Sequence, residues 1–269
     1  MRKIKIALLQ MRTDIDAGEN LHKAEDLIIF ASGEGADIVV LPEMFSIPYM
    51  NEYMKVSMQP VDGEIISSLC SLARDNNVNI LAGTIAEAVS PDKCYNTSVF
   101  INRDGKVLAA HRKLHLYDVD FDGITVKESD VVMPGSTVTV FDTEFGKAGI
   151  AVCYDLRFAD MFSKMSKLGA ELIFVPAAFN MVTGPPHWEL LLRARALDNQ
   201  VFIAACSPSS NPDLPYDPYG HSLVADPWGC VVSSAGRAEA IIYAEIDLDY
   251  VDTVRKKIPL KLHRRDGIY

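Results

Sequence analysis

The sequence has no long apolar run and no excess of positive charge. None of its apolar segments approaches the length of about 20 residues that a membrane-spanning helix needs. The apolar run after the basic residues 1–5 ends at Gln10, which is too short for the core of a signal peptide. The net charge is −10, whereas a protein that binds nucleic acid would need a basic footprint. We therefore expect neither a membrane nor a nucleic acid as a partner.

Paired cysteine motifs are also missing. The five cysteines are odd in number and widely spaced, at positions 70, 94, 153, 206 and 230. This pattern is typical of a reducing compartment and contains no Cys-x-x-Cys pair that would hold a metal. His111 and His115 lie four residues apart, but Arg112 stands where zinc proteases carry a glutamate after the first histidine. The sequence therefore predicts a cytoplasmic protein without a metal site.

What is present is the patterning of an α/β protein. Hydrophobic residues make up 49% of the 269 residues, which is enough for a sizeable core. Continuously apolar segments predict strands over 4–9, 38–41, 150–152 and 172–175, and helices are expected over 20–32, 64–76, 158–168 and 187–199. Continuously apolar strands must be buried on both faces, by helices on one side and by another sheet on the other. Because no linker rich in Gly, Ser or Pro divides the chain, we expect a single domain over residues 1–269.

The chain also contains an internal echo. Residues 35–42 (GADIVVLP) return as 169–176 (GAELIFVP), and residues 98–105 (SVFINRDG) are echoed by 222–229 (SLVADPWG). A further strand-like run, 78–82 or 201–205, lies between the members of each pair. Two echoes in the same order indicate a duplicated architecture. We predict an α/β fold in which two pseudo-repeated halves pack sheet to sheet, as a four-layer α-β-β-α sandwich.

Three side chains that could take part in catalysis follow strand-like or hairpin-like segments. Glu43 follows the apolar run 38–42, Lys113 lies in a basic cluster after the hairpin-like segment 99–108, and Cys153 follows the small or apolar residues 149–152. A thiol at the rim of a sheet is accessible to a substrate, and a following helix N-terminus stabilises its thiolate. Taken singly, each also has a structural interpretation: a buried cysteine, a solvated strand end and a surface charge cluster.

Together these segments resemble the nitrilase superfamily of carbon–nitrogen hydrolases. The matching motifs are Leu41-Pro42-Glu43, His111-Arg112-Lys113-Leu114-His115 and Cys153-Tyr154-Asp155-Leu156-Arg157-Phe158. The resemblance extends from the first strand almost to the C-terminus and implies the same four-layer fold. It is nearest to the omega-amidases, which hydrolyse the terminal amide of short dicarboxylic monoamides such as 2-oxoglutaramate. The further matches are Phe45-Ser46-Ile47-Pro48-Tyr49, Asp118-Val119-Asp120, residues 179–188 and residues 195–200. Ile47 departs from the pattern, since those enzymes usually carry a polar or small residue there.

These residues supply the parts of an amide hydrolase. The Cys153 thiolate would attack the amide carbonyl, and Glu43 would take the thiol proton and return it to the leaving nitrogen. Lys113 and the backbone N–H of Tyr154 would stabilise the oxyanion. Water then hydrolyses the thioester, so no metal or organic cofactor is required. The resemblance assigns the same roles and implies that Glu128 orients Lys113 or the substrate amide, the alternative being a solvated loop carboxylate.

Selectivity for one amide depends on other residues. Arg157 follows Cys153 by four residues, and its guanidinium would bind a substrate carboxylate through two parallel hydrogen bonds. The alternative is a structural ion pair with Asp155, Asp160 or another acid. Tyr49 would donate to the same carboxylate, or serve as a core aromatic with a wet hydroxyl.

The sequence is also compatible with two other functions, and the resemblance implies an oligomeric state. The same three residues would serve a hydrolase of N-carbamoyl compounds or of unsubstituted aliphatic amides. A protein of another class, a catalytically silent binding protein, would use the same scaffold. The resemblance also implies a homodimer that pairs through the surface near the nucleophile-bearing helix.

Overall fold

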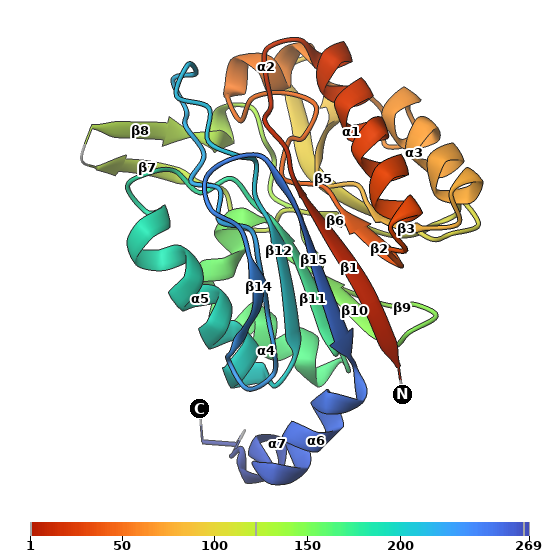
Figure 1. Cartoon of the computed structure of the whole chain (residues 1–269). Helices are drawn as coiled ribbons and strands as arrows, with labels where there is room; N and C mark the ends of the chain where they lie inside the picture. The colour runs from red at the N-terminus through yellow and green to blue at the C-terminus, as the bar shows by residue number, and fades with distance from the viewer. Residues whose placement is uncertain (1, 122, 266, 269) are drawn as a thin grey trace.

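The computed structural model describes residues 2–121, 123–265 and 267–268, and places two β-sheets between two layers of helices (Figure 1). The first sheet has the order β15-β1-β2-β3-β5-β4, with β6 paired to β5. Its strands are β1 (Lys3–Gln10), β2 (Ile38–Val40), β3 (Asn79–Leu81), β4 (Ile85–Ser90), β5 (Lys93–Ile101), β6 (Val107–Arg112) and β15 (Ala240–Asp247). The pairs β1–β2 and β2–β3 are parallel, and the remaining pairs are antiparallel.

The second sheet repeats this plan with the order β14-β13-β12-β11-β10-β9. Its strands are β9 (Thr139–Asp142), β10 (Lys147–Ile150), β11 (Leu172–Pro176), β12 (Phe202–Cys206), β13 (Leu223–Ala225) and β14 (Val231–Ser234). Here β10, β11 and β12 are parallel, and β13 returns antiparallel to β12. The run of three parallel strands followed by antiparallel ones is the same in both sheets, which confirms the duplicated α/β architecture.

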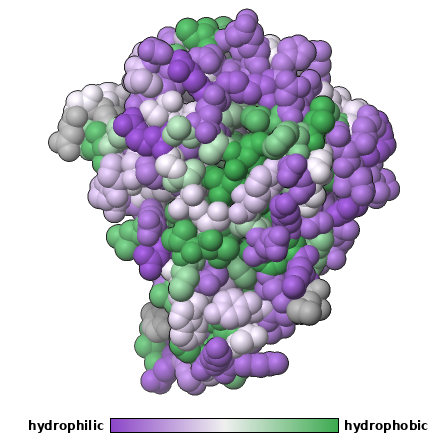
Figure 2. All heavy atoms as spheres, in the orientation of Figure 1, coloured by the Kyte–Doolittle hydropathy of each residue, from purple (hydrophilic) through white to green (hydrophobic). Residues whose placement is uncertain are grey.

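Two helices cover the outer face of each sheet. They are α1 (Ala17–Gly33) and α3 (Glu64–Asp75) on the first sheet, and α4 (Ala159–Lys167) and α5 (Gly184–Asn199) on the second. Asp16 caps α1 by accepting from the N–H groups of Gly18 and Glu19, and two prolines open α5, where their missing N–H groups do no harm. The outer sides of α1 and α3, at the right of Figure 2, are mostly hydrophilic. The smaller helices are α2 (Asn51–Val56), α6 (Asp249–Lys257) and α7 (Leu260–His263).

Of the apolar cores formed by the described residues, three follow the layers. The central core packs Leu8 and Val40 of the first sheet with Phe174 and Ala204 of the second. A second core joins α1 and α3 to the first sheet, and a third joins α4 and α5 to the second. The order of the cores is that of the predicted α-β-β-α sandwich. No helix in the described ranges has the length and apolar character to cross a bilayer.

The structure differs from the predicted strands at one position and adds several elements that were not predicted. The predicted strand 150–152 is wrong beyond Ile150, where β10 ends. The chain turns because Cys153 has a positive φ of 45° and the Val152 N–H donates to the Asp155 carboxylate. Among the added elements are α2 and the hairpin of β7 (Asp118–Phe121) and β8 (Ile124–Lys127), which stands away from both main sheets (Figure 1).

Candidate active site

Glu43 lies in a tight loop after β2. Met44, the next residue, has a positive φ of 49°, and its N–H donates to the Thr84 hydroxyl at 2.9 Å. Gly83 packs so closely that a Cβ built on it would lie 2.0 Å from the Pro42 carbonyl oxygen. This loop leaves the Glu43 side chain fully buried. The predicted alternative of a solvated strand end is therefore wrong.

Lys113 directly follows β6, and its backbone forms hydrogen bonds with two other segments. Its N–H donates to the Asn96 carbonyl of β5 at 2.9 Å, and its own carbonyl accepts from the Gly135 N–H at 2.8 Å. The ammonium is fully buried, 3.1 Å from Glu43 Oε1 and 2.9 Å from Glu128 Oε1. Lys113 is thus a buried cation between two carboxylates, and the alternative of a surface charge cluster is wrong.

Cys153 opens the 3₁₀-helix Cys153–Arg157 just after β10. A positive φ in a residue other than glycine is a strained conformation that persists only where its surroundings impose it. Here the imposing contacts come from Asp155, which accepts from the N–H groups of Val152 and His115 at 3.0 and 2.9 Å. The turn brings Cys153 to Glu43 and Lys113, whose charges both act on the thiol.

Burial decides the protonation states of these groups. Desolvation raises the pKa of the Glu43 carboxyl, although the Lys113 charge opposes the shift. Desolvation and the nearby Glu43 carboxylate raise the pKa of the Cys153 thiol well above its usual range. Desolvation disfavours the Lys113 charge, but Glu128 and Glu43 outweigh it and raise the pKa of the ammonium. The resting site therefore holds a neutral thiol beside a charged lysine.

Glu128 and Tyr49 both contact Lys113. The second Glu128 oxygen accepts from the Tyr117 N–H at 2.7 Å, and the residue is 1% exposed, so the alternative of a solvated loop carboxylate is wrong. Tyr49 takes a hydrogen bond from the Lys113 ammonium at 3.2 Å and packs against Tyr216. Its hydroxyl therefore faces the lysine side of the site, and no contact with Arg157 is found in the described chain.

Arg157 and Cys153 line one small pocket. The other lining residues are Tyr117, Tyr154, Ala178, Phe179, Thr183 and Tyr216. The Arg157 guanidinium lies over the rings of Tyr154 and Phe179 and 3.2 Å from His187 Nδ1. Within the described residues no carboxylate pairs with it, so the predicted ion pair with Asp155 or Asp160 is absent. Asp155 is bound instead by His115 and the Val152 N–H.

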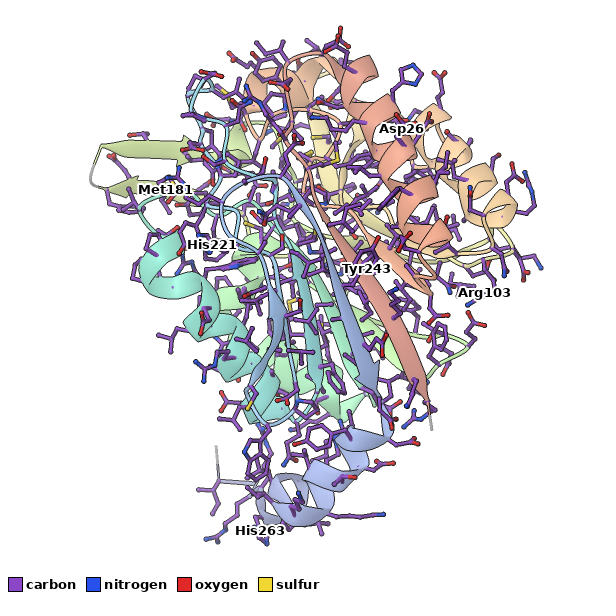
Figure 3. All side chains as sticks on the ribbon, in the orientation of Figure 1. Asp26, Arg103, Met181, His221, Tyr243 and His263 are labelled. Carbon is purple, nitrogen blue, oxygen red and sulfur yellow. The ribbon has the colours of Figure 1, made fainter. Side chains whose placement is uncertain are left out.

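A wider cleft lies outside this pocket. It runs under the β7–β8 hairpin and is lined by Tyr49, Lys127, Met181 and Tyr216, among others. Figure 3 labels Met181 between the hairpin and the first turn of α5. Tyr216 lines both spaces, so the cleft adjoins the pocket that contains Cys153.

Several neighbours of the site were not predicted from the sequence, among them Asp155 and Asn96. Asp155 lies within a quoted motif but was considered only as a partner of Arg157. Asn96 is fully buried, and its amide Nδ2 donates to Glu43 Oε1 at 2.8 Å and to Glu128 Oε1 at 3.3 Å. The available signal was the polar run 96–98 inside an otherwise apolar segment.

Comparison with known proteins agrees with this geometry. The carbon-nitrogen hydrolase family model matches residues 5–256. The chain belongs to this family. It is 42% identical over 270 residues to omega-amidase NIT2 of Xenopus tropicalis, an alignment that covers 100% of this chain and 98% of that protein.

Solved structures place the chain in the nitrilase superfamily. Saccharomyces cerevisiae Nit3, a member of branch 10 of that superfamily, superposes with a TM-score of 0.89 at 38% identity, over 99% of this chain and 97% of that one. An amidase from Nesterenkonia sp., whose active-site cysteine is covalently modified by fluoroacetamide, superposes with a TM-score of 0.80 at 25% identity, over 96% of each chain.

Proposed function

We propose that this carbon–nitrogen hydrolase is an omega-amidase. It would cleave the terminal amide of small dicarboxylic monoamides to acid and ammonia, with 2-oxoglutaramate and 2-oxosuccinamate as lead substrates. The observation that supports this choice is the shared pocket of Cys153 and Arg157. A guanidinium there would donate two parallel hydrogen bonds to a substrate carboxylate at a fixed distance from the scissile carbonyl. A neutral end group cannot accept both of these hydrogen bonds as well. The similarity to NIT2 adds independent support.

The proposed acylation uses the buried groups in turn. The thiol proton of Cys153 passes to Glu43 as sulfur bonds to the amide carbon. The oxyanion so formed is stabilised by the Lys113 ammonium and the Tyr154 N–H, while Glu128 holds the lysine in place. Collapse of this intermediate breaks the C–N bond, Glu43 returns the proton to nitrogen, and ammonia leaves a thioester.

Deacylation reverses the roles. Glu43 takes a proton from water, whose oxygen attacks the thioester carbon, and Lys113 again stabilises the oxyanion. The C–S bond then breaks and the proton returns to sulfur. Every proton, acyl group and electron pair is accounted for by the side chains and water, so the proposed cycle calls for no metal or organic cofactor.

The substrate assignment is tested by comparing a monoamide that carries a free carboxylate with the same amide methylated on that carboxylate. We expect wild-type kcat/KM to favour the free acid, and Arg157→Lys to reduce this preference by about tenfold or more, because one strong charged contact is lost. Arg193→Lys, at an exposed arginine of α5 paired with Glu189, is the matched control and should keep the wild-type preference. Equal losses on both amides would assign Arg157 to the fold instead.

We also propose a homodimer in the cytoplasm. The helix layer near Cys153 exposes apolar side chains at Phe158, Leu168, Leu190 and Leu197, which a partner copy would cover. The cytoplasmic location is supported by the five cysteines, which are all unpaired.

A further inference from the structure

Asn96 makes three separate contacts with the site from the middle of β5. Its backbone carbonyl accepts from the Lys113 N–H, and its amide Nδ2 donates to both Glu43 and Glu128. The two neighbours of Asn96 in the strand contact other residues. Thr97 donates to Glu87, which pairs with Arg112, and the Arg112 guanidinium lies over the Tyr95 ring. Asn96 is thus the residue of β5 that joins the lysine and both glutamates.

The site needs such a donor because its charges do not balance. Glu43 and Glu128 both present Oε1 to the single Lys113 ammonium, so two carboxylates share one cation in a buried space. The negative charge of Glu128 raises the pKa of Glu43, whereas the hydrogen bond from Asn96 lowers it. A neutral amide supplies donors without adding the charge that a second buried cation would bring.

The orientation of the Asn96 amide is fixed by these partners. Turning the amide over would point its Oδ1 at two carboxylate oxygens, which is repulsive. In the orientation found, Oδ1 is buried without a partner in the described structure. An unpaired buried acceptor is costly and rare. The described structure therefore leaves two buried acceptors of this cluster, Asn96 Oδ1 and Glu43 Oε2, without a hydrogen-bond partner, while Asn96 Nδ2 binds both glutamates.

We propose that Asn96 is a positioning residue, which holds Glu43 aimed at Cys153 by binding it and Glu128 through one amide. The inference rests on the proposed role of Glu43 as the base, and not on the identity of the amide substrate. The charged and titratable groups that face Glu43 are Lys113, Glu128, Cys153, Tyr49 and Tyr216. Because the substitutions below leave all five in place, a change in pH dependence reports on Asn96.

The test is the rate of alkylation of Cys153 by iodoacetamide as a function of pH, followed by mass spectrometry of the Cys153 peptide in the folded enzyme. Glu43→Gln is the reference and should react slowly at every pH below the range in which the thiol itself ionises. With Asn96→Ala, the acidic limb of the profile should move to higher pH by about one unit, so the rate measured on that limb should fall about tenfold, since the carboxylate loses one strong donor.

Asn96→Asp keeps the shape but adds a third carboxylate, so its limb should move further than that of Asn96→Ala. If Asn96→Ala does not fold, this isosteric variant still tests the proposed role of Asn96. Asn79→Ala is the matched control: Asn79 is a buried asparagine of β3 whose amide binds the Asp37 carbonyl and Glu144, away from the site. It should lose stability but keep the wild-type limb.

The inference is overturned if the Asn96 variants that fold keep the wild-type limb, or if Asn79→Ala moves it as far as Asn96→Ala does. Failure of the underlying role of Glu43 has a different signature. In that case Glu43→Gln would alkylate like the wild type, whatever the Asn96 variants do. A failed substrate assignment would leave all of these rates unchanged, because iodoacetamide needs no carboxylate pocket.

Discussion

At the scale of single residues, Cys153 is singled out by its backbone. Of the five cysteines, only Cys153 has a positive φ, and the charges of Glu43 and Lys113 both act on its thiol. Cys153→Ala should fold normally and lose amidase activity by several orders of magnitude, as removal of a nucleophile does in other enzymes. Cys94→Ala, another buried cysteine, is the control and should keep its activity. Retention of more than about a tenth of the rate in Cys153→Ala would refute the assignment.

Glu43 and Lys113 should affect turnover more than substrate binding. Glu43→Gln keeps the shape but removes the proton acceptor, and should lower kcat about a hundredfold to ten-thousandfold. Lys113→Ala should lower kcat to a similar extent and also reduce stability, because Glu43 and Glu128 are then left buried without their cation. Steady-state kinetics with one amide separate kcat from KM. An effect confined to KM would require the two roles to be reassigned.

The pH dependence follows from the burial of Glu43. Its pKa is raised above the ordinary value of 4.5, chiefly by desolvation, and the base must be ionised to act. Activity should therefore fall as the pH decreases through this raised pKa, so the acidic limb of kcat/KM should lie above pH 4.5. Initial rates over a pH series measure it, with unfolding followed in parallel to exclude acid denaturation.

At the scale of elements, Asp155 ties the 3₁₀-helix of Cys153 to the segment of Lys113. Its carboxylate accepts from the Val152 N–H and from both the N–H and the Nδ1 of His115. Asp155→Asn replaces an acceptor oxygen by a donor, which leaves buried donors unpaired and should lower the free energy of unfolding by about 2–4 kcal/mol. Denaturant titration measures this loss, and a loss below about 1 kcal/mol would contradict the role.

The same variant has a defined pH dependence. Desolvation acts to raise the pKa of Asp155, but hydrogen bonds from His111, His115 and Val152 outweigh it and lower the pKa. A carboxyl whose folded-state pKa is depressed contributes stability above its unfolded pKa and loses it as the pH falls through the folded value. The difference between wild type and Asp155→Asn should therefore be constant at neutral pH and shrink in strong acid.

Gly83 controls the loop that carries Glu43. An alanine there would need the strained φ of 44° and would place its Cβ 2.0 Å from the Pro42 carbonyl oxygen. Gly83→Ala should displace the loop and lower both stability and kcat. Gly35→Ala is the matched control, because Gly35 also has a positive φ but has nothing within 4 Å of its Cβ. It should lose stability through backbone strain alone, so equal activity losses in both variants would contradict the argument.

The sequence was sufficient to predict the main strands and helices and the site residues that directly follow a strand. Glu43 and Cys153 each follow an apolar strand, and Lys113 lies in a basic cluster at the end of a hairpin strand, so local patterning locates them. The burial of Glu128 could not be read locally, because it depends on Lys113 and the Tyr117 N–H closing over it. Asn96 was missed for a similar reason: a polar residue in a strand is usually exposed, and its partners come from three other segments.

At the scale of the whole molecule, the duplicated fold places a layer of helices on each outer side. Both layers expose some apolar side chains, among them Ile29 of α1, Leu168 at the end of α4 and Leu197 of α5. The proposed dimer uses the layer of α4 and α5, which is nearest to Cys153. The choice between the layers is therefore open to a direct experiment with residues of equal exposure.

Leu168→Glu combined with Leu197→Glu should convert a dimer into a monomer, because a charge on each of two apolar contacts must be desolvated on pairing. Ile29→Glu is the matched control, since Ile29 is 47% exposed and Leu168 and Leu197 are each 46% exposed. Size-exclusion chromatography with light scattering at micromolar concentration measures the mass. A wild-type monomer would contradict the dimer itself, and a shift produced only by Ile29→Glu would place the interface on the α1 and α3 layer.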